Sequence, residues 1–489
     1  MSGPALIALT AAGELLARRL QPVLPGSAVH GLQTRTTAPD VPFADTGPHL
    51  RKLFEAGVPI VGIAAAGILI RLVAPAIADK GSEPPMIAIA EDGSAVVPLL
   101  GGHRGANRLA RVLADFLGIK AAVTTAGDVG LGFALDDPPS GWAVGNRQAA
   151  KVIAAALLAG EPVALLLDDG VDADLDWLRA TGAAFSNDPA LRPAVRVTHR
   201  IETAEDIFVL HPRSLVLGVG CERGCDPKEL QDLALAAMQG AGLSEKSVAC
   251  VASLDLKSDE TAVLQLAASL SVPARFFDAA TLEAETPRLA NPSEIVFAEV
   301  GCHGVAEGAA LAATGPFGQL LVPKSKSARA TVALAQAPKP IDAMMIGQAR
   351  GRLSIVGIGP GAAAWRTPEA TAMLQAATDV VGYGLYLDLL GDLIAGKARH
   401  QSQLSEEEAR VRIALDLAAT GRNVALVSSG DAGIYAMAAL AFELLERDND
   451  PAWNRIDIAV APGISAVQAA AARIGAPLLY LEGELEASL

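Results

Sequence analysis

The chain has 489 residues, of which 51% are hydrophobic and only 4% aromatic, and its formal net charge is -15. The length allows three or more domains, and the many small residues favour α/β layers, in which helices pack closely on sheets. The acidic balance argues against a general nucleic-acid-binding protein. The four cysteines are too few for a disulfide framework and fit a reducing cytosol, so we expect a cytoplasmic protein.

The N-terminal region contains the most apolar stretch of the chain, residues 58–78 (VPIVGIAAAGILIRLVAPAIA). Its length would suit a membrane span, but Arg71 and Pro75 interrupt it. We therefore expect a strand at Pro59–Ala64 followed by a buried helix, and no membrane partner. No basic segment precedes the first apolar run, so a secretory signal is not expected either.

The next feature is a glycine-rich turn at residues 101–105 (GGHRG), which leads into a helix from Asn107 with apolar residues at helical spacing. Such a turn before a helix can bind an anion, and His103 and Arg104 make this one a candidate site. A plain helix-entry turn is the alternative. A short apolar strand is expected after it, at Ala121–Thr125.

Residues 131–205 are less regular, with one clear apolar strand at Val163–Leu167. An acidic run, DDGVDADLD, follows that strand at residues 168–176. Because no histidine or metal-ligand spacing accompanies the carboxylates, a solvated loop is a better explanation than a metal site.

From Ser214 onward, strands and helices alternate at short spacing, which predicts a further α/β domain. Strands are expected at Leu215–Val219, Val248–Ala252, Ile295–Val300 and Leu320–Pro323. Asp226 as N-cap and Pro227 at the first helical position open one helix, and the small residues after Gly304 form another. Residues 336–352, with two prolines and a basic end, predict a linker.

The last region opens with a buried strand from Leu353 that runs into three closely spaced glycines, Gly357, Gly359 and Gly361. Later strands are expected at Asp379–Gly382, Val424–Ser428 and Asp457–Val460, and the last two also run into glycine-containing turns. In an open α/β sheet, ligands bind beyond the carboxyl ends of the strands. A cofactor is therefore expected over Gly359 and Gly361.

Three kinds of cofactor compete for this turn. GIGPGA fits the dinucleotide pattern, but the second strand ends in Gly382 and Tyr383 where a ribose-binding acid is required, and Pro360 delays the next helix. A nucleotide phosphate would need G-x-x-x-x-G-K-[ST], which the sequence lacks. The third candidate is S-adenosylmethionine.

Four motifs carry a specific resemblance: GIGPG (357–361), VVGY ending at Tyr383, SSGDAGIY (428–435) and APGISA (461–466). In this order and spacing they resemble the tetrapyrrole methylase family, and within it the precorrin-3B methyltransferases that act on carbon 17 and contract the ring. The resemblance implies that the methyl donor S-adenosylmethionine contacts residues in all four motifs. These are Gly359, Pro360, Gly361, Tyr383, Gly430, Asp431, Ala432, Ile434, Ser465 and Ala466.

Asp431 could instead be the N-cap of the following helix, and the two roles are compatible. The chemistry agrees with the resemblance, because methyl transfer from a sulfonium depends on alignment more than on an acid or a base. The family normally has a second α/β domain that closes the cleft. The chain after Gly351 is long enough for one domain only, and its end, LLYLEGELEASL, is unlike the family's continuation. We therefore expect a shortened methylase part.

The upstream region carries a second resemblance, through AAAGILIRLVAP (64–75), LLGGHRGANRLA (99–110), LGVGCERG (217–224), SLDLKSDE (253–260) and GCHGVAEGAAL (301–311). These motifs resemble the cobalt-precorrin-5A hydrolases, which open a δ-lactone on the macrocycle and release acetaldehyde. Such a reaction needs an activated water and stabilisation of an oxyanion. The catalytic candidates are His103 with Arg104, and then Glu307, each with a structural role as the alternative.

Cysteines and a histidine at the ends of expected strands raise the question of a metal. Cys221, Cys225, Cys302 and His303 lack the two-pair spacing of zinc sites, so buried thiols are the better explanation and no metal is expected.

The sequence thus predicts several three-layer α/β domains, the last resembling the N-terminal domain of tetrapyrrole methylases. The expected boundaries are 1–130, a middle region 131–212, 213–335, a linker 336–352 and a partial methylase domain 353–489. The implied function is cobalamin (corrin ring) biosynthesis: methylation of precorrin-3B at carbon 17 from S-adenosylmethionine, fused to a lactone hydrolase-like part.

Two other functions stay open: that only the hydrolase-like part is active, or that the chain is a non-catalytic scaffold that channels tetrapyrroles. The implied partner is an acidic tetrapyrrole, bound by local arginines. The resemblance also suggests a homodimer through the methylase domain.

Overall fold

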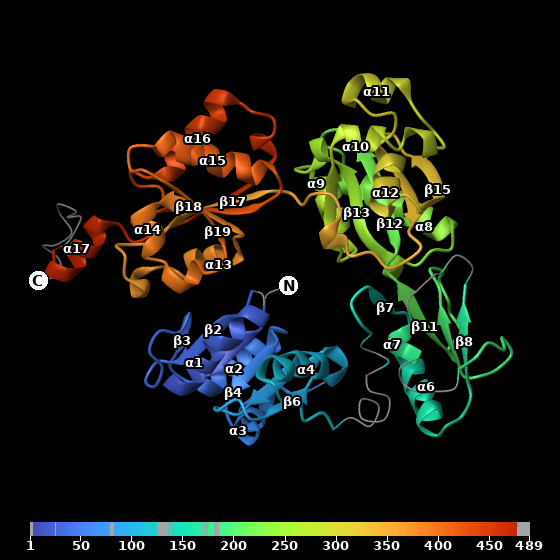
Figure 1. Cartoon of the computed structure of the whole chain (residues 1–489), viewed down its shortest axis with the longest axis horizontal. Coiled ribbons are helices and arrows are strands. Elements are labelled where there is room, and N and C mark those ends of the chain that lie inside the picture. Colours follow the sequence, from blue (N-terminus) through green and yellow to red (C-terminus); the bar gives the residue numbers. More distant parts are fainter. Residues whose placement is uncertain are drawn as a thin grey trace, which may run out of the picture. The chain divides into compact units, whose positions relative to one another are not determined.

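The described residues form four β-sheets with helices packed on them. The computed structural model describes residues 3–24, 26–78, 83–124, 135, 138–168, 171, 175–179 and 185–476. The chain divides into two compact units, Met1–Ala349 and Arg350–Leu489. Three sheets belong to the first unit and one to the second (Figure 1). The predicted α/β class is confirmed.

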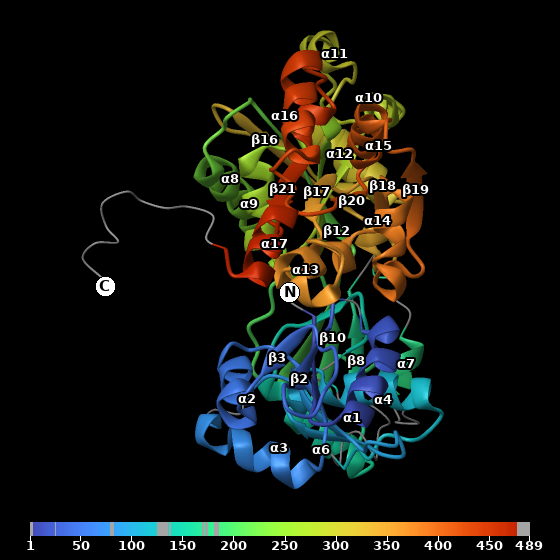
Figure 2. The ribbon, with the colours of Figure 1, turned by 90° about the vertical axis from the view of Figure 1, so that its left-hand side faces the viewer.

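The first sheet has the order β3-β2-β1-β4-β5-β6, with β6 alone antiparallel to its neighbour. Its strands are β1 (Ala5–Ala8), β2 (Ala28–Leu32), β3 (Val41–Phe43), β4 (Ile60–Ile63), β5 (Met86–Ile89) and β6 (Val96–Leu100). Helices α1 (Ala11–Leu20) and α4 (Ala106–Leu117) cover one face, and α2 (Thr46–Glu55) and α3 (Ala66–Val73) cover the other (Figure 2).

Two predictions for this region have different outcomes. The apolar stretch 58–78 forms β4 and α3, as expected. The strand expected at Ala121–Thr125 is wrong for residues 121–124, which are not in a strand; only the Ala122 amide reaches β6, donating to the Val96 carbonyl at 2.8 Å. Thr125 lies outside the described residues.

The second sheet has the order β7-β11-β10-β8-β9, in which β7 alone is antiparallel. Its strands are β7 (Trp142–Val144), β8 (Val163–Leu167), β9 (Phe185–Ser186), β10 (Ala194–Val197) and β11 (Ile207–Pro212). Helices α6 (Gln148–Leu158) and α7 (Asp176–Arg179) pack on one face. Among the described residues no helix covers the other face, so this domain departs from the three-layer prediction.

The third sheet has the order β14-β13-β12-β16-β15. Its strands are β12 (Leu215–Cys221), β13 (Val248–Leu254), β14 (Ala274–Phe277), β15 (Gln319–Lys326) and β16 (Ala330–Gln336). Helices α8 (Pro227–Gly240) and α9 (Thr261–Ser269) lie on one face and α12 (Val305–Thr314) on the other, with the shorter α10 (Ala279–Glu283) and α11 (Glu294–Val300) before α12. Asp226 caps α8, with Pro227 at its first position, as predicted.

One strand prediction in this domain is wrong, and another is confirmed, since Leu320–Pro323 lies within β15. Ile295–Val300 is helical, not extended: the Ser293 side chain accepts the Val296 amide as N-cap, and Gly301 ends the helix with a φ of 77°. These local end signals override the β-branched and aromatic character of IVFAEV. The strand expected at Leu320–Pro323 is one arm of a hairpin, whose other arm, β16, pairs with β12 inside the sheet.

The segment expected to be a linker is attached to this third domain up to Gln348. Gln348 and Phe276 exchange backbone hydrogen bonds of 2.8 Å in both directions. The buried Arg275 guanidinium donates to the carbonyls of Ile346 and Gly347 at 2.5 and 2.8 Å. The division between the two units falls immediately after this segment.

The fourth sheet is fully parallel, with the order β19-β18-β20-β17-β21. Its strands are β17 (Arg352–Gly357), β18 (Asp379–Tyr383), β19 (Ala398–Ser402), β20 (Asn423–Ser428) and β21 (Asp457–Ala461). Helices α15 (Glu407–Ala419) and α16 (Met437–Asp448) lie on one face, and α13 (Pro368–Ala376) and α14 (Gly384–Asp388) on the other (Figure 1). Helix α17 (Ala466–Ile474) follows β21.

Short 3₁₀ helices connect these elements: η1 (Gln21–Val23), η2 (Ala74–Ala76), η3 (Gly102–Arg104), η4 (Glu245–Ser247), η5 (Asp255–Lys257), η6 (Thr286–Arg288), η7 (Ala343–Met345), η8 (Ala363–Trp365), η9 (Gly391–Ile394) and η10 (Trp453–Arg455). No single helix in the described part of the chain is long and apolar enough to cross a membrane. Only the bent pair of α11 and α12 meets the length and composition criteria, and α12 is mostly buried.

Candidate functional site

Three of the four glycine motifs meet at the carboxyl edge of the parallel sheet. Strand β17 lies between β20 and β21, and its residues Val356 and Gly357 pair with Ala461 and Ser428, respectively. The strands therefore end side by side, and the turns that follow them are brought into contact. Gly359 and Gly430 exchange backbone hydrogen bonds of 3.1 and 2.9 Å across this edge.

The glycines are required because the turns pack backbone against backbone. A Cβ on Gly463 would lie 2.0 Å from the Gly430 carbonyl oxygen, and one on Gly357 would lie 2.5 Å from the same atom. Gly359 also has a φ of 72°, which residues other than glycine rarely adopt. Only hydrogen atoms fit at these points, so larger side chains would separate the turns.

Asp431 connects two of the turns through its carboxylate. One oxygen accepts the Gly433 amide at 2.8 Å, within its own turn, and the other accepts the Gly463 amide at 2.9 Å, in the turn after β21. The alternative role as a helix N-cap is wrong, because α16 begins at Met437 with Ala436 as its N-cap. Asp431 thus orders the backbone around the expected cofactor cleft.

The remaining predicted cofactor residues lie around these turns. Ser465 caps α17, with its hydroxyl accepting the Gln468 amide, and Ala466 is the first residue of that helix. Ala432 is buried in the core, whereas Pro360 and Ile434 are exposed at the edge. The contacts of these residues with a cofactor stay predictions.

Two further predicted residues lie near α14, beside the main group of turns. Tyr383 ends β18 and packs edge-on against Tyr386, with ring centroids 5.3 Å apart. Gly361, with a φ of 114°, lies next to Leu389, whose side chain would be 3.5 Å from an added Cβ. The first turn therefore extends toward the segment that follows β18.

The structure also supports the argument against a dinucleotide. Asp379 lies at the start of β18, at the amino edge of the sheet, and its carboxylate accepts hydrogen bonds from Arg422 at 2.7 Å and His400 at 2.9 Å. These hydrogen bonds hold the pKa of Asp379 below its usual value although burial opposes them. Asp379 is a structural anchor and is not available to a ribose at the carboxyl edge.

The residues at that edge fit a methyl donor with an amino-acid end and an apolar nucleoside end. The turns present backbone groups and small side chains, and each oxygen of the Asp431 carboxylate accepts one backbone amide. Exposed apolar side chains, Leu389, Ile434 and Val467, lie in the surrounding segments. An edge of this kind can hold a zwitterion through backbone groups and an adenine ring through apolar contact.

The hydrolase candidates lie in two different domains. His103 and Arg104 are in η3, directly before α4, between Gly101 and Gly105, which both have positive φ. Arg104 is exposed. The His103 side chain is outside the described part of the structure. Both roles stay predictions.

Glu307 is in the first turn of α12 and is almost fully buried, with 1% of its surface exposed. Its carboxylate accepts the amides of Ala290, Asn291 and Lys324 and the side-chain amide of Asn291, at 2.8 to 3.0 Å. Burial raises the pKa of Glu307, but the hydrogen bonds from Asn291 and Lys324 outweigh it and hold the pKa below its usual value. This geometry favours the structural alternative.

The cysteines are free thiols, as expected, and no group of metal-binding side chains occurs among the described residues. Burial raises the pKa of Cys221 to about 11 and that of Cys250 to about 12. His303 Nδ1 donates to the Glu283 carboxylate at 2.9 Å, and this contact raises the pKa of the imidazole. His303 therefore pairs with carboxylates, Glu283 at 2.9 Å and Glu294 at 3.6 Å.

Sequence comparisons agree with both parts of this description. Residues 48–128, 138–212 and 215–335 match the family models "Cobalamin synthesis G N-terminal", "Cobalamin biosynthesis central region" and "Cobalamin synthesis G C-terminus". The chain is 56% identical over 121 residues to protein CobE of Sinorhizobium sp, which covers 25% of this chain and 79% of CobE. The chain belongs to the cobalamin-biosynthesis G family. Residues 352–481 match the model "Tetrapyrrole (Corrin/Porphyrin) Methylases", so a methylase domain follows the family's three regions.

Two further relatives are named after single reactions. The cobalt-precorrin-5A hydrolase of Priestia megaterium is 28% identical over 308 residues, which is 59% of this chain and 81% of that protein. The precorrin-3B C(17)-methyltransferase of Sinorhizobium sp is 44% identical over 129 residues, 26% of this chain and 50% of the relative. The crystal structure of the methyltransferase CobJ is 41% identical, with a TM-score of 0.25, and covers 28% of this chain and 58% of that one.

The methylase domain therefore spans about half the length of these methyltransferase relatives. Sequence reasoning missed one further feature, a cavity lined by arginines in the middle domain. Its residues come from separate strands and loops of a region that the sequence predicts as irregular, so no local pattern marked it.

Proposed function

We propose that the chain acts in corrin-ring synthesis, with a methyltransferase domain that methylates a precorrin-3B-type macrocycle at carbon 17 and a hydrolase part that opens the lactone of a cobalt-precorrin-5A-type macrocycle. The homodimer and the cytoplasmic location belong to the same proposal. The observation that carries the methyltransferase assignment is the convergence of the turns after β17, β20 and β21, with Asp431 accepting amides from two of them.

In this proposal the turn residues bind and orient. S-adenosylmethionine, the methyl donor of the tetrapyrrole methylases, supplies an electrophilic methyl group, which moves to a ring carbon while the sulfur keeps the electron pair of the broken bond. The Gly359–Gly430 pairing and the Asp431 carboxylate fix the backbone amides that hold the donor. Alignment of donor and acceptor carbon is the contribution that such a rigid edge can make to the rate.

The hydrolase proposal rests on the three family regions and on the relative named as a hydrolase. Water adds to the lactone carbonyl and the ring C–O bond breaks, which leaves a carboxylic acid and a hydroxyl on a two-carbon fragment of the macrocycle. The C–C bond between that fragment and the macrocycle then breaks: the macrocycle keeps the electron pair and takes up a proton, the hydroxyl loses its proton, and the fragment leaves as acetaldehyde. His103 at the start of α4 is the proposed base, and Arg104 is the proposed partner of the oxyanion. The tetrapyrrole acid groups would be bound by arginines.

Calorimetric titration of the full chain with S-adenosylhomocysteine tests the methyltransferase part. We expect saturable binding to the wild-type chain and weakened binding to Asp431→Ala. Absence of binding, or binding that Asp431→Ala leaves unchanged, would remove the assignment and favour a non-catalytic tetrapyrrole scaffold.

Acetaldehyde release from the lactone macrocycle tests the hydrolase part independently. Loss of release in His103→Ala, with the thermal unfolding transition preserved, would support the proposed base. Release that survives this substitution would exclude His103 from that role.

A further inference from the structure

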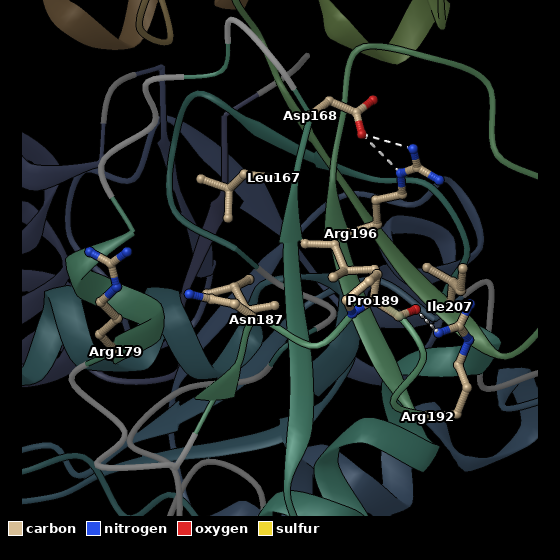
Figure 3. Close-up of a pocket in the computed structure, with 10 residues that line it drawn as sticks. Leu167, Asp168, Arg179, Asn187, Pro189, Arg192, Arg196 and Ile207 are labelled. Atoms are coloured by element: carbon tan, nitrogen blue, oxygen red, sulfur yellow. Dashed lines mark hydrogen bonds and ion pairs between the residues drawn. The ribbon is translucent and has the colours of Figure 1, made fainter.

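The middle domain contains a cavity of about 640 Å³ beside β8. Its lining residues come from β8, α7, β10, the start of β11 and the loop around β9: Leu165, Leu166, Leu167, Asp168, Arg179, Asn187, Pro189, Arg192, Arg196 and Ile207. Figure 3 shows Arg179 and Asn187 on one side of β8 and Arg196 and Arg192 on the other. The volume is in the range of small-molecule sites.

The cavity runs along the sheet and is not confined to one edge. Leu167 and Asp168 are at the carboxyl end of β8, whereas Arg192 precedes β10 and Ile207 is the first residue of β11, at the amino edge of the same parallel strands. Leu166 and Ile207 belong to the apolar face of this sheet that no helix among the described residues covers. An open apolar face with polar groups at its margins can hold a ligand with an apolar body.

Two of the three arginines in the lining are already neutralised. Arg196 is held between Asp168 at 2.9 Å and Glu202 at 3.0 Å, and these carboxylates raise the pKa of the guanidinium. Arg192 pairs with Asp206 at 3.1 Å. These ion pairs form part of the cavity lining and contribute little net positive charge to it.

Within the described part of the chain, Arg179 is the lining arginine that has no counter-charge. It is exposed at the end of α7, and its guanidinium makes no hydrogen bond or ion pair with another described residue. The Asn187 side chain, on the same side of β8, can donate a further hydrogen bond. Leucines 165–167, Pro189 and Ile207 supply the apolar part of the lining. A ligand that carries one anionic group on an apolar body matches this combination of one cation, one amide donor and an apolar lining.

We propose that this cavity is a binding site for a carboxylate substituent of the acidic tetrapyrrole, with Arg179 as the ion-pair partner and Asn187 as a second donor. The ligand class rests on the proposed function, in which the macrocycle is the substrate. The macrocycle bears acidic side chains on an apolar ring, so the carboxylate meets Arg179 while the adjacent ring edge contacts the leucines. The middle domain thereby holds the substrate by one acidic arm.

The test uses the full chain and uroporphyrin III, a stable tetrapyrrole polycarboxylate, as the probe. Hydrogen exchange should slow at residues 185–196 when the probe binds. Arg179→Gln and Asn187→Asp should each weaken uroporphyrin binding about three- to tenfold, as for a partly exposed ion pair. The matched control is Arg147→Gln, an exposed arginine of the same domain outside the cavity, which should leave the affinity within about twofold.

Further arms separate the possible sources of the carboxylate and the two proposals. Glutarate and inorganic phosphate are titrated against the same variants. If the affinity for these small anions depends on Arg179 while the affinity for uroporphyrin does not, the tetrapyrrole assignment is overturned. It is also overturned if Arg179→Gln and Asn187→Asp both keep the wild-type uroporphyrin affinity and hydrogen exchange. S-adenosylhomocysteine titration of Arg179→Gln should match the wild type. If S-adenosylhomocysteine does not bind the wild type while uroporphyrin still depends on Arg179, the methyltransferase proposal fails and the cavity proposal stands.

Discussion

The substitution Asp431→Asn tests whether one carboxylate holds the cofactor turns together. The wild-type oxygens accept the Gly433 and Gly463 amides at 2.8 and 2.9 Å. Asparagine keeps one acceptor but places an NH2 group against the other amide. A hydrogen bond to a charged group contributes about 1.5–3 kcal/mol, so we expect local stability to fall by about 2 kcal/mol. The Gly463 amide should then exchange roughly 30-fold faster, because about 1.4 kcal/mol corresponds to a factor of ten.

Hydrogen exchange of the full chain, resolved at residues 430–435 and 461–466, measures this effect, and S-adenosylhomocysteine affinity should fall in parallel. The matched control is Asp457→Asn in the same domain. Asp457 forms an exposed ion pair with Arg352 at 3.3 Å, at the amino end of β21. Exchange at residues 461–466 should not change in the control. Equal exchange in Asp431→Asn and wild type, or equal acceleration in both variants, would refute the bridging role.

Four other outcomes follow from the described contacts. Gly463→Ala places a methyl group 2.0 Å from the Gly430 oxygen and should abolish S-adenosylhomocysteine binding in calorimetry while circular dichroism keeps the helical signal. Glu307→Gln should lower the free energy of unfolding, measured in urea at pH 7, by about 2 kcal/mol. In the wild type the folded-state pKa of Glu307 is lowered, so the stabilisation by its carboxylate is full above the unfolded-state pKa of about 4.3. It is lost as the pH falls through the folded-state pKa. Burial lowers the pKa of His199 to about 4, so the local free energy of unfolding should fall by up to about 3 kcal/mol between pH 6.5 and 4. The measurement is hydrogen exchange of the Ser244 amide, which donates to the His199 carbonyl and should exchange faster at the lower pH. Cys221, the least buried thiol, should react with iodoacetamide first yet slowly at pH 8, since its pKa is about 11; rapid labelling of any cysteine would contradict the burial described here.

The methylase domain is the part that its sequence predicts best, for a physical reason. Strands β17, β18 and β20 are buried, apolar runs, and β17 and β20 lead into glycines that the packing of the turns requires. The polar edge strand β19, with the sequence ARHQS, carries no such pattern and was not predicted. The start of α13 can also be predicted from the sequence, since Thr367 is its N-cap and Pro368 its first residue. Local chemistry and tertiary packing specify the same structure there.

Elements specified by distant partners were harder to predict. Strand β16 lies inside the sheet because it pairs with β12, more than a hundred residues earlier, and the sequence ATVALAQ does not indicate that pairing. In α11 the composition suggested a strand, and the cap at Ser293 decided otherwise. Arg179 has no motif around it, and only the folded sheet brings it beside Asn187.

The glycine motifs have a different meaning once the turns are seen in contact. Gly357 and Gly463 are needed because the Gly430 carbonyl lies where their side chains would be, whatever ligand is bound. The motifs therefore identify how three strand ends pack, and the choice of cofactor depends on other residues. It rests on the absence of an acid after β18, where Gly382 and Tyr383 stand, and on Asp431, whose charge is used within the protein and not offered to a ribose. A dinucleotide enzyme could be excluded on these two residues even if every glycine were kept.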